Sequence, residues 1–224
     1  MKATKHVYFA DQGNSLFIIS ALTILNSPTG WGQLYKWVET FDQPAADYQI
    51  ELISNADIIS KFGEKFDGLS AASIGTTKTQ NTAYINISRW AHGSAESRLT
   101  LRQYRKYVIN HEVGHLLGLH HPDLSANNTN SNKCPNMAVQ TDGMCDKSYR
   151  ENVEPLPYEI ELVKKFQTKQ TFAISHISKS PNISLGKKTL LYSGCMVILI
   201  LLILLIALIT RLVWPDYNQD SQAR

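Results

Sequence analysis

The chain has 224 residues, which is enough for one domain with appended segments, and 43% of them are hydrophobic. This apolar share suffices for a folded core, so an ordinary globular domain is expected. The formal net charge is only +3, which gives no reason to expect a nucleic-acid partner.

Strands and a helix alternate through the first half of the chain, a pattern that predicts an α/β sheet domain. The apolar run at residues 16–25 has polar flanks and is followed by Pro28 and Gly30, so it predicts a buried helix. Strands are predicted where short apolar or alternating runs occur, at residues 6–10, 34–40, 48–53 and 82–88.

The segment 54–80 between the last two strands has no strong period and is rich in Gly, Ser and Thr after Gly63. It is predicted to be a long loop that borders a functional cleft. The strand at 82–88 would then lie at the rim of that cleft, where an exposed strand can bind a peptide by strand addition. The alternative is that it is only the last strand of the sheet.

A long helix is predicted over residues 99–119, because buried-type side chains recur on it at spacings of three and four. Its end carries the pattern HExxHxxGxxH. His111 and His115 are four residues apart and share one helix face, so both imidazoles can reach one metal ion. Gly118 can take the left-handed conformation that turns the chain, which brings His121 back as a third ligand.

These ligands predict a catalytic zinc site, since three protein ligands with one open position are typical of catalytic Zn²⁺. Glu112 follows His111 directly and is close enough to act on a water at the metal without being a ligand. Two alternatives stay open. His120, one residue short of the motif, is a rival third ligand, or the pattern is a helix end with solvated histidines or a decayed site.

Cysteines and a second helix follow the motif. Cys134 and Cys145 form a plausible short disulfide, whereas Cys195 falls within a long apolar segment. Residues 158–166 have helical spacing, with acids first and lysines last, which suits the helix dipole. The folded domain is therefore expected to occupy residues 1–167.

The C-terminal part of the chain predicts a single-pass membrane anchor. Residues 189–210 carry no charge and are long enough to span the hydrocarbon core, so a lipid bilayer is an expected partner. Residues 168–188 are expected to form a basic juxtamembrane linker, and residues 211–224 a short tail.

The side of the membrane is indicated in two opposite ways. Lysines accumulate before the span, and the positive-inside rule then places the main domain in the cytoplasm. A disulfide between Cys134 and Cys145 would instead indicate an oxidising, extracytoplasmic compartment. The cytoplasmic location is the expectation, with the extracytoplasmic one as its alternative.

The motif from His111 to His121 resembles that of the metzincin clan of zinc peptidases. The resemblance implies a methionine turn beneath the metal, for which Met137 is the better candidate and Met144 the weaker. It also implies an α/β (α+β) catalytic domain with a mixed sheet, two main helices and a smaller C-terminal subdomain. Some metzincins have a tyrosine two residues after that methionine, where this chain has Val139.

A closer resemblance is to a bacterial family of predicted metzincin-type metallopeptidases that was long labelled only as a domain of unknown function. It covers most of residues 7–157. The chain departs from the pattern in a longer segment between His121 and Cys134, and in carrying its anchor at the C-terminal side. The residues that carry the resemblance are Trp31, 84–90, 104–115, 134–137, Gln140, Thr141 and Gly143.

The predicted function is that of a membrane-anchored zinc endopeptidase acting on a peptide or protein substrate. Glu112 would serve as general base for a zinc-activated water and then pass the proton to the leaving amine. The alternative is a non-catalytic, membrane-tethered binding or scaffold module that keeps the zinc site. The intact Glu112 favours the enzyme, because a structural site does not need that carboxylate.

Overall fold

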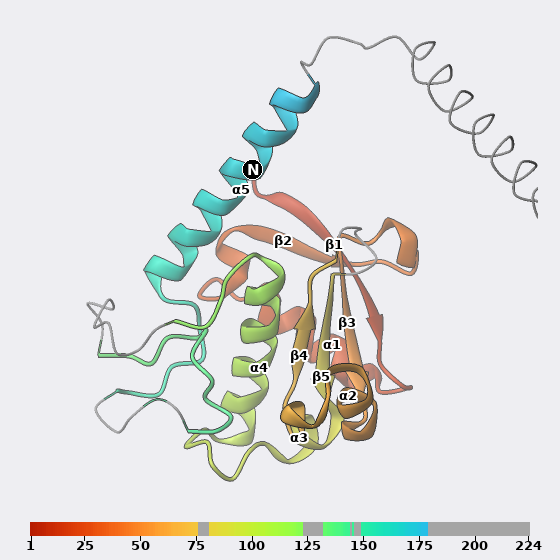
Figure 1. Cartoon of the computed structure of the whole chain (residues 1–224), viewed down its shortest axis with the longest axis vertical. Coiled ribbons are helices and arrows are strands. Elements are labelled where there is room, and N and C mark those ends of the chain that lie inside the picture. The colour runs from red at the N-terminus through yellow and green to blue at the C-terminus, as the bar shows by residue number, and fades with distance from the viewer. Residues whose placement is uncertain (76–80, 123–131, 144, 146–148, 179–224) are drawn as a thin grey trace, which may run out of the picture. The chain divides into compact units, whose positions relative to one another are not determined.

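The structure is a computed structural model of the whole chain (Figure 1). The chain divides into two compact units, Met1–Thr171 and Phe172–Arg224. Of the second unit, only the last turns of one helix are described. The residues that the structure describes are 1–75, 81–122, 132–143, 145 and 149–178.

The first unit is built on a five-stranded mixed sheet with the order β2-β1-β3-β5-β4 (Figure 1). Strand β1 pairs in parallel with β2 and β3, β3 pairs in parallel with β5, and β4 runs antiparallel to β5. The predicted α/β class is therefore confirmed. The strands are β1 (Ala3–Ala10), β2 (Tyr35–Glu39), β3 (Tyr48–Ile53), β4 (Ala71–Ser73) and β5 (Thr82–Asn86).

Helices connect and cover these strands, and three short 3-10 turns join them. The α-helices are α1 (Ser15–Leu25), α2 (Asn55–Phe62), α3 (Ile87–His92), α4 (Leu101–Leu116) and α5 (Pro157–Ser178). The 3-10 turns are η1 (Trp31–Gln33), η2 (Gln43–Ala45) and η3 (Glu64–Phe66).

The main core lies between one face of the sheet and helices α1 and α4. Strand side chains alternate in direction, so every second residue of each strand points towards these helices. Helix α2 contacts β5, where the Phe62 and Tyr84 rings pack 5.3 Å apart. Tyr84 lies between two core-facing residues of β5, which places α2 on the opposite face. The core-facing residues of the strands include Val7, Phe9, Trp37, Tyr48, Ile50, Leu52, Ala83 and Ile85.

The segment 54–80 borders a cleft, as expected, but it is not the long loop that was predicted. It contains helix α2, the turn η3 and strand β4, with residues 76–80 outside the described part. The helix begins where Ser54 accepts a hydrogen bond from the Asp57 amide at 3.1 Å, which is an N-cap. A capping serine and two apolar residues four apart, Ile58 and Phe62, were the missed sequence signals.

The predicted rim strand at 82–88 was also misplaced. Strand β5 lies inside the sheet between β3 and β4, so β4 is the edge strand on this side. β5 ends at Asn86 because the Asn86 side chain accepts hydrogen bonds from the Ser88 and Arg89 amides, at 3.0 and 3.3 Å. These bonds start helix α3 where the sequence suggested two more strand residues.

The two predicted helices in the second half have different bounds from those expected. Helix α4 begins after a capping box formed by Thr100 and Gln103, and it ends before Gly118, whose φ of +95° is left-handed. Helix α5 continues to Ser178, well beyond the predicted end at 166. The proposed linker at 168–188 is therefore helical in its first part.

Among the described residues, no helix is both long enough and apolar enough to cross a membrane. The predicted span at residues 189–210 and the tail at 211–224 lie outside the described part of the chain.

The Asn86 side chain links the end of β5 to the start of α2 and to the segment before β4. Its loss should therefore lower the stability of the fold more than the loss of an ordinary helix cap. Its side chain is fully buried, and its amide nitrogen donates to Asn55 Oδ1 at 2.8 Å and to the Leu69 carbonyl at 3.3 Å. We expect Asn86→Ala to lower the free energy of unfolding by about 2 kcal/mol or more, since it removes both an N-cap and buried cross-links. Urea unfolding followed by circular dichroism measures this loss.

Asn14→Ala is the matched control. Asn14 also caps a helix, through a 3.2 Å bond from the Phe17 amide, but it is exposed. Its loss should cost about 1 kcal/mol. Equal losses for the two variants would show that the Asn86 cross-links do not hold this part of the fold.

Candidate metal centre

Three histidine side chains converge at the end of helix α4. His111 and His115 come from the last two turns of the helix, and His121 comes from the segment that follows it. Their Nε2 atoms form a triangle with sides of 3.2, 3.2 and 3.1 Å. Three nitrogens on one tetrahedral Zn²⁺ lie about 3.3–3.4 Å apart when each bond is about 2.05 Å. The cluster therefore has the size that a tetrahedral metal ion requires.

The Nδ1 atoms of His111 and His115 fix which atom of these two imidazoles faces the centre. His111 Nδ1 lies 2.8 Å from the Asn136 carbonyl, and His115 Nδ1 lies 2.8 Å from the Leu119 carbonyl. A carbonyl only accepts, so each Nδ1 carries the proton in a neutral ring and each Nε2 presents a lone pair. Lone pairs that face one another at about 3.2 Å repel unless a cation lies between them. The donor set thus fits a metal ion chemically as well as geometrically.

The turn at Gly118 places the third histidine. The Gly118 amide donates to the His115 carbonyl at 2.9 Å, and the Leu119 amide donates to the Gly114 carbonyl at 3.0 Å, which closes the end of the helix. A Cβ at Gly118 would approach the Phe166 ring to 2.6 Å, and the φ of +95° disfavours other residues. The chain therefore turns sharply here, and His121, not its neighbour His120, joins the cluster.

Met137, the residue that the resemblance to metzincins singled out, packs against helix α4 at Gly114. It is buried, and a side chain at Gly114 would collide with its sulfur atom. Gly114, which stands between the two histidines of the helix, is thus needed to let the methionine approach. Trp31 packs on the same spot and donates from Nε1 to the Asn110 carbonyl at 2.8 Å. Met144, the weaker candidate, lies outside the described residues.

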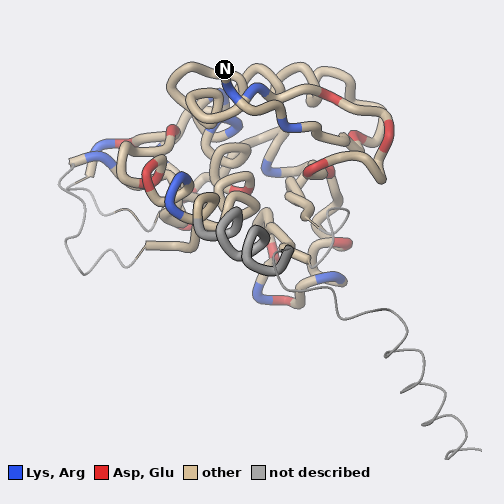
Figure 2. The backbone as a smooth tube through the Cα atoms, turned by 90° about the horizontal axis from the view of Figure 1, so that it is seen from above, with Lys and Arg blue, Asp and Glu red and all other residues tan. Residues whose placement is uncertain are grey.

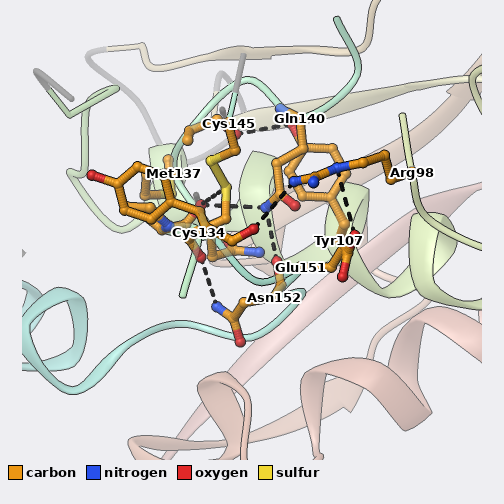
Figure 3. Close-up of a disulfide and its surroundings, with 12 residues drawn as sticks. Arg98, Tyr107, Cys134, Met137, Gln140, Cys145, Glu151 and Asn152 are labelled. Carbon is orange, nitrogen blue, oxygen red and sulfur yellow. Dashed lines mark hydrogen bonds and ion pairs between the residues drawn. A yellow bond between two sulfur atoms is a disulfide. The ribbon is translucent and has the colours of Figure 1, made fainter. Parts of the chain in front are cut away.

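A disulfide between Cys134 and Cys145 closes the loop that carries Met137 (Figure 3). The expected cysteine pair is thus bonded in the structure. Further bonds hold the loop from outside, because Gln140 Nε2 donates to the Asn152 carbonyl at 2.8 Å and Asn152 Nδ2 donates to the Cys134 carbonyl at 3.0 Å. The loop beneath the histidines is therefore fixed by covalent and polar links together.

Helix α4 holds the same loop through Tyr107, which lies one turn before His111. The buried Tyr107 hydroxyl donates to the Ala138 carbonyl at 3.2 Å and accepts from the Gln140 amide at 3.0 Å (Figure 3). Sequence reasoning missed Tyr107, although its spacing of four from His111 placed it on the ligand face. It also missed the role of Glu159, whose acidic position in the first turn of α5 indicates a helix start but not its contacts with Asn136 and Met137.

The histidine cluster opens into a cleft of about 360 Å³. Among the described residues that line it, Glu112 is the only acid, and none is Lys or Arg. Lys and Arg are interspersed with Asp and Glu along the described backbone (Figure 2). One wall comes from strand β4 and the segment before it. The described lining residues are Phe66, Leu69, Ser70, Ala71, Ala72, Ile74, Tyr107, His111, Glu112, His115, Leu119, His120, His121, Val139 and Thr141.

Burial changes the acidity of the groups at this centre in opposite directions. It raises the pKa of the Glu112 carboxyl to about 8, because the charged form is poorly solvated there. It lowers the pKa of His115 to about 4, and burial followed by the neighbouring His115 lowers the pKa of His111 well below its usual value. At neutral pH the imidazoles are therefore neutral ligands, and Glu112 holds a proton until a cation is near.

The fold and the cluster define a mixed α/β domain with a three-histidine site that can hold a metal ion. The model of a family described as "Protein of unknown function (DUF3152)" matches residues 6–157, and the chain belongs to this family. No curated protein matches the sequence.

Replacement of single histidines tests which residue is the third ligand. We expect His121→Ala to weaken Zn²⁺ binding by on the order of 100-fold or more. The removal of a metal ligand lowers the affinity more than the removal of a residue that only contacts a ligand. His120→Ala, one residue away and outside the cluster, should stay within about threefold of the wild type. Competition with a fluorescent zinc chelator measures both affinities, and the reverse order would assign the site to His120.

The raised pKa of Glu112 predicts that metal binding releases a proton at pH 7. The carboxyl is protonated below its pKa of about 8, and a cation beside it favours the carboxylate, so the proton leaves when Zn²⁺ binds. The neutral imidazoles have none to release. Calorimetry in buffers of different ionisation enthalpy counts the protons.

Glu112→Gln is the control for this proton count, since it keeps the size of the side chain and removes the acid. It should release about one proton fewer than the wild type at pH 7, and the difference should fade above pH 8 as Glu112 ionises without metal. The same count for both proteins at pH 7 would contradict a protonated Glu112.

Proposed function

We propose that this protein is a zinc-dependent endopeptidase of the metzincin type. The observation that carries the proposal is the triangle of three Nε2 atoms, which opens into a cleft beside one buried carboxyl group. Three imidazoles and an open position favour catalytic Zn²⁺ over a structural ion, which is usually held by four protein ligands. The mixed sheet, the turn at Gly118 and the buried Met137 beneath the site support a metzincin-like fold.

The chemistry is divided between the metal and Glu112. A bound Zn²⁺ polarises a scissile carbonyl and lowers the pKa of water at its open position towards neutrality. Glu112 accepts the proton of the attacking water and passes it to the leaving amine. Its high pKa before the metal binds shows how poorly solvated this carboxylate is, and a poorly solvated base takes a proton readily.

Strand β4 supports a peptide as the substrate. It stands at the edge of the described sheet with β5 as its partner, and Ala71 and Ala72 line the cleft. An extended peptide can pair with such an edge through backbone hydrogen bonds and thereby lie across the histidine cluster. Residues 82–88 cannot offer such an edge, because β5 lies between β3 and β4. We therefore propose that the peptide pairs with β4.

The membrane anchor remains part of the proposal, with residues 189–210 as the span. The lysine bias before this segment favours a cytoplasmic domain. The Cys134–Cys145 disulfide supports the alternative, in which the domain faces an oxidising compartment. A structural disulfide beneath the active site is difficult to keep in a reducing cytoplasm, so we favour the extracytoplasmic side.

Glu112→Ala tests the catalytic step directly. We expect peptide hydrolysis to fall by on the order of 100-fold to 10,000-fold, because general base catalysis is lost, while Zn²⁺ stays bound. Cleavage of a peptide library followed by mass spectrometry, with zinc content measured on the same samples, gives both quantities.

Glu161→Ala is the matched control, since Glu161 is an exposed carboxylate on α5, paired with Lys164 at 2.6 Å. It should cleave like the wild type. Full activity of Glu112→Ala would contradict the proposed mechanism. Bound zinc with no cleavage of any peptide by the wild type would favour the rival function, a binding or scaffold module.

A further inference from the structure

Glu159 is a buried carboxyl group that the proposed chemistry does not use. It lies in the first turn of α5 and only 1% of its surface is exposed. Its oxygens accept three backbone hydrogen bonds, from Met137 to Oε1 at 2.8 Å, and from Asn136 at 3.2 Å and Leu156 at 2.6 Å to Oε2. A buried acid in contact with three amide donors is held in one orientation.

Two of these three donors belong to the turn that supports the metal ligands. The carbonyl of Asn136 lies 2.8 Å from His111 Nδ1, and the side chain of Met137 packs against the helix at Gly114. Glu159 thus holds the backbone of Asn136 from the amide side, while the carbonyl of the same residue orients His111. The peptide unit between Asn136 and Met137 therefore carries both the N–H that bonds Glu159 and the carbonyl that contacts His111.

The third donor fixes Glu159 itself. The Leu156 amide precedes α5, so its bond to Glu159 is one half of a capping box at the start of that helix. A negative charge in the first turn also suits the helix dipole. Helix α5 is anchored by Val163, which is fully buried in the main core. Because α5 is held in place, the Glu159 carboxylate also holds the turn at Asn136 and Met137 in place through its hydrogen bonds.

We propose that Glu159 is a positioning residue of the metal centre, which sets the orientation of His111 through the backbone of Asn136 and Met137. The inference rests on the proposed metal site. It adds an outer contact from a helix that contributes no ligand, and such contacts tune the affinity and geometry of metal sites. A group with acceptors at both ends fits here, because the carboxylate accepts backbone N–H bonds at each of its two oxygens.

Glu159→Gln tests the inference with almost no change in size. The amide NH₂ would face at least one backbone N–H, so one buried donor would lose its partner and the turn would shift. Co²⁺ is the probe, because its visible spectrum reports the geometry of the site without any peptide cleavage. We expect Glu159→Gln in the full chain to bind Co²⁺ about 10-fold to 100-fold more weakly and with an altered spectrum.

Three further variants separate positioning from general stability. Glu161→Gln on the exposed side of α5 should behave like the wild type. Ile58→Ala removes a fully buried side chain from α2, on the opposite face of the sheet, and should lower the urea midpoint of unfolding, yet leave the Co²⁺ spectrum unchanged. Glu159→Asp keeps both acceptor oxygens on a shorter stem, so it should restore part of the affinity that Glu159→Gln loses.

The possible outcomes separate a failure of the positioning role of Glu159 from a failure of the metal centre itself. A wild-type spectrum and affinity for Glu159→Gln, or an equal spectral change for Ile58→Ala, would overturn the positioning role. If Glu159→Gln does not fold, Glu159→Asp decides, since wild-type affinity and spectrum would then count against the inference. Failure of the wild type to bind Co²⁺ would overturn the metal centre itself, and the role of Glu159 with it.

Discussion

The candidate metal centre depends on the convergence of three imidazole nitrogens within about 3.2 Å of one another. The carbonyls of Asn136 and Leu119 hold two of these rings with their lone pairs inward, which is costly unless a cation balances them. Most other features near the site serve this arrangement. Gly114 makes room for Met137, Gly118 turns the chain, and the disulfide closes the loop that supplies the Asn136 carbonyl.

The site is assembled from parts with different tasks. Helix α4 supplies two of the three clustered histidines and Glu112. Burial lowers the pKa of His111 and raises the pKa of Glu112, so the imidazole stays neutral and the carboxyl is hard to ionise. Strand β4 supplies one wall of the cleft and an edge on which a peptide can lie. Helix α5 supplies no ligand, but its first turn fixes the loop beneath the histidines. Under the proposed function, the chemistry, the binding of the substrate and the positioning of the ligands would come from three separate elements.

The histidine cluster could be predicted from the sequence because its geometry is local. His111, His115 and His121 lie within eleven residues, so helix periodicity and one glycine decide where they meet. Met137 was found only through a family resemblance, since nothing in its own segment indicates a contact with Gly114. The edge strand β4 was missed because it has only three residues, too few to show an alternating pattern. The bonds of Glu159 to Asn136 and Met137 were missed because they join segments 22 and 23 residues apart in the chain.

X-ray absorption at the zinc edge of the zinc-loaded full chain tests the central claim most directly. We expect one ion per chain with three imidazole nitrogens at about 2.0–2.1 Å and one oxygen at a similar distance. A sulfur neighbour at about 2.3 Å, or a shell of six oxygens, would contradict a catalytic three-histidine site. A chain that retains no zinc at neutral pH would contradict it as well.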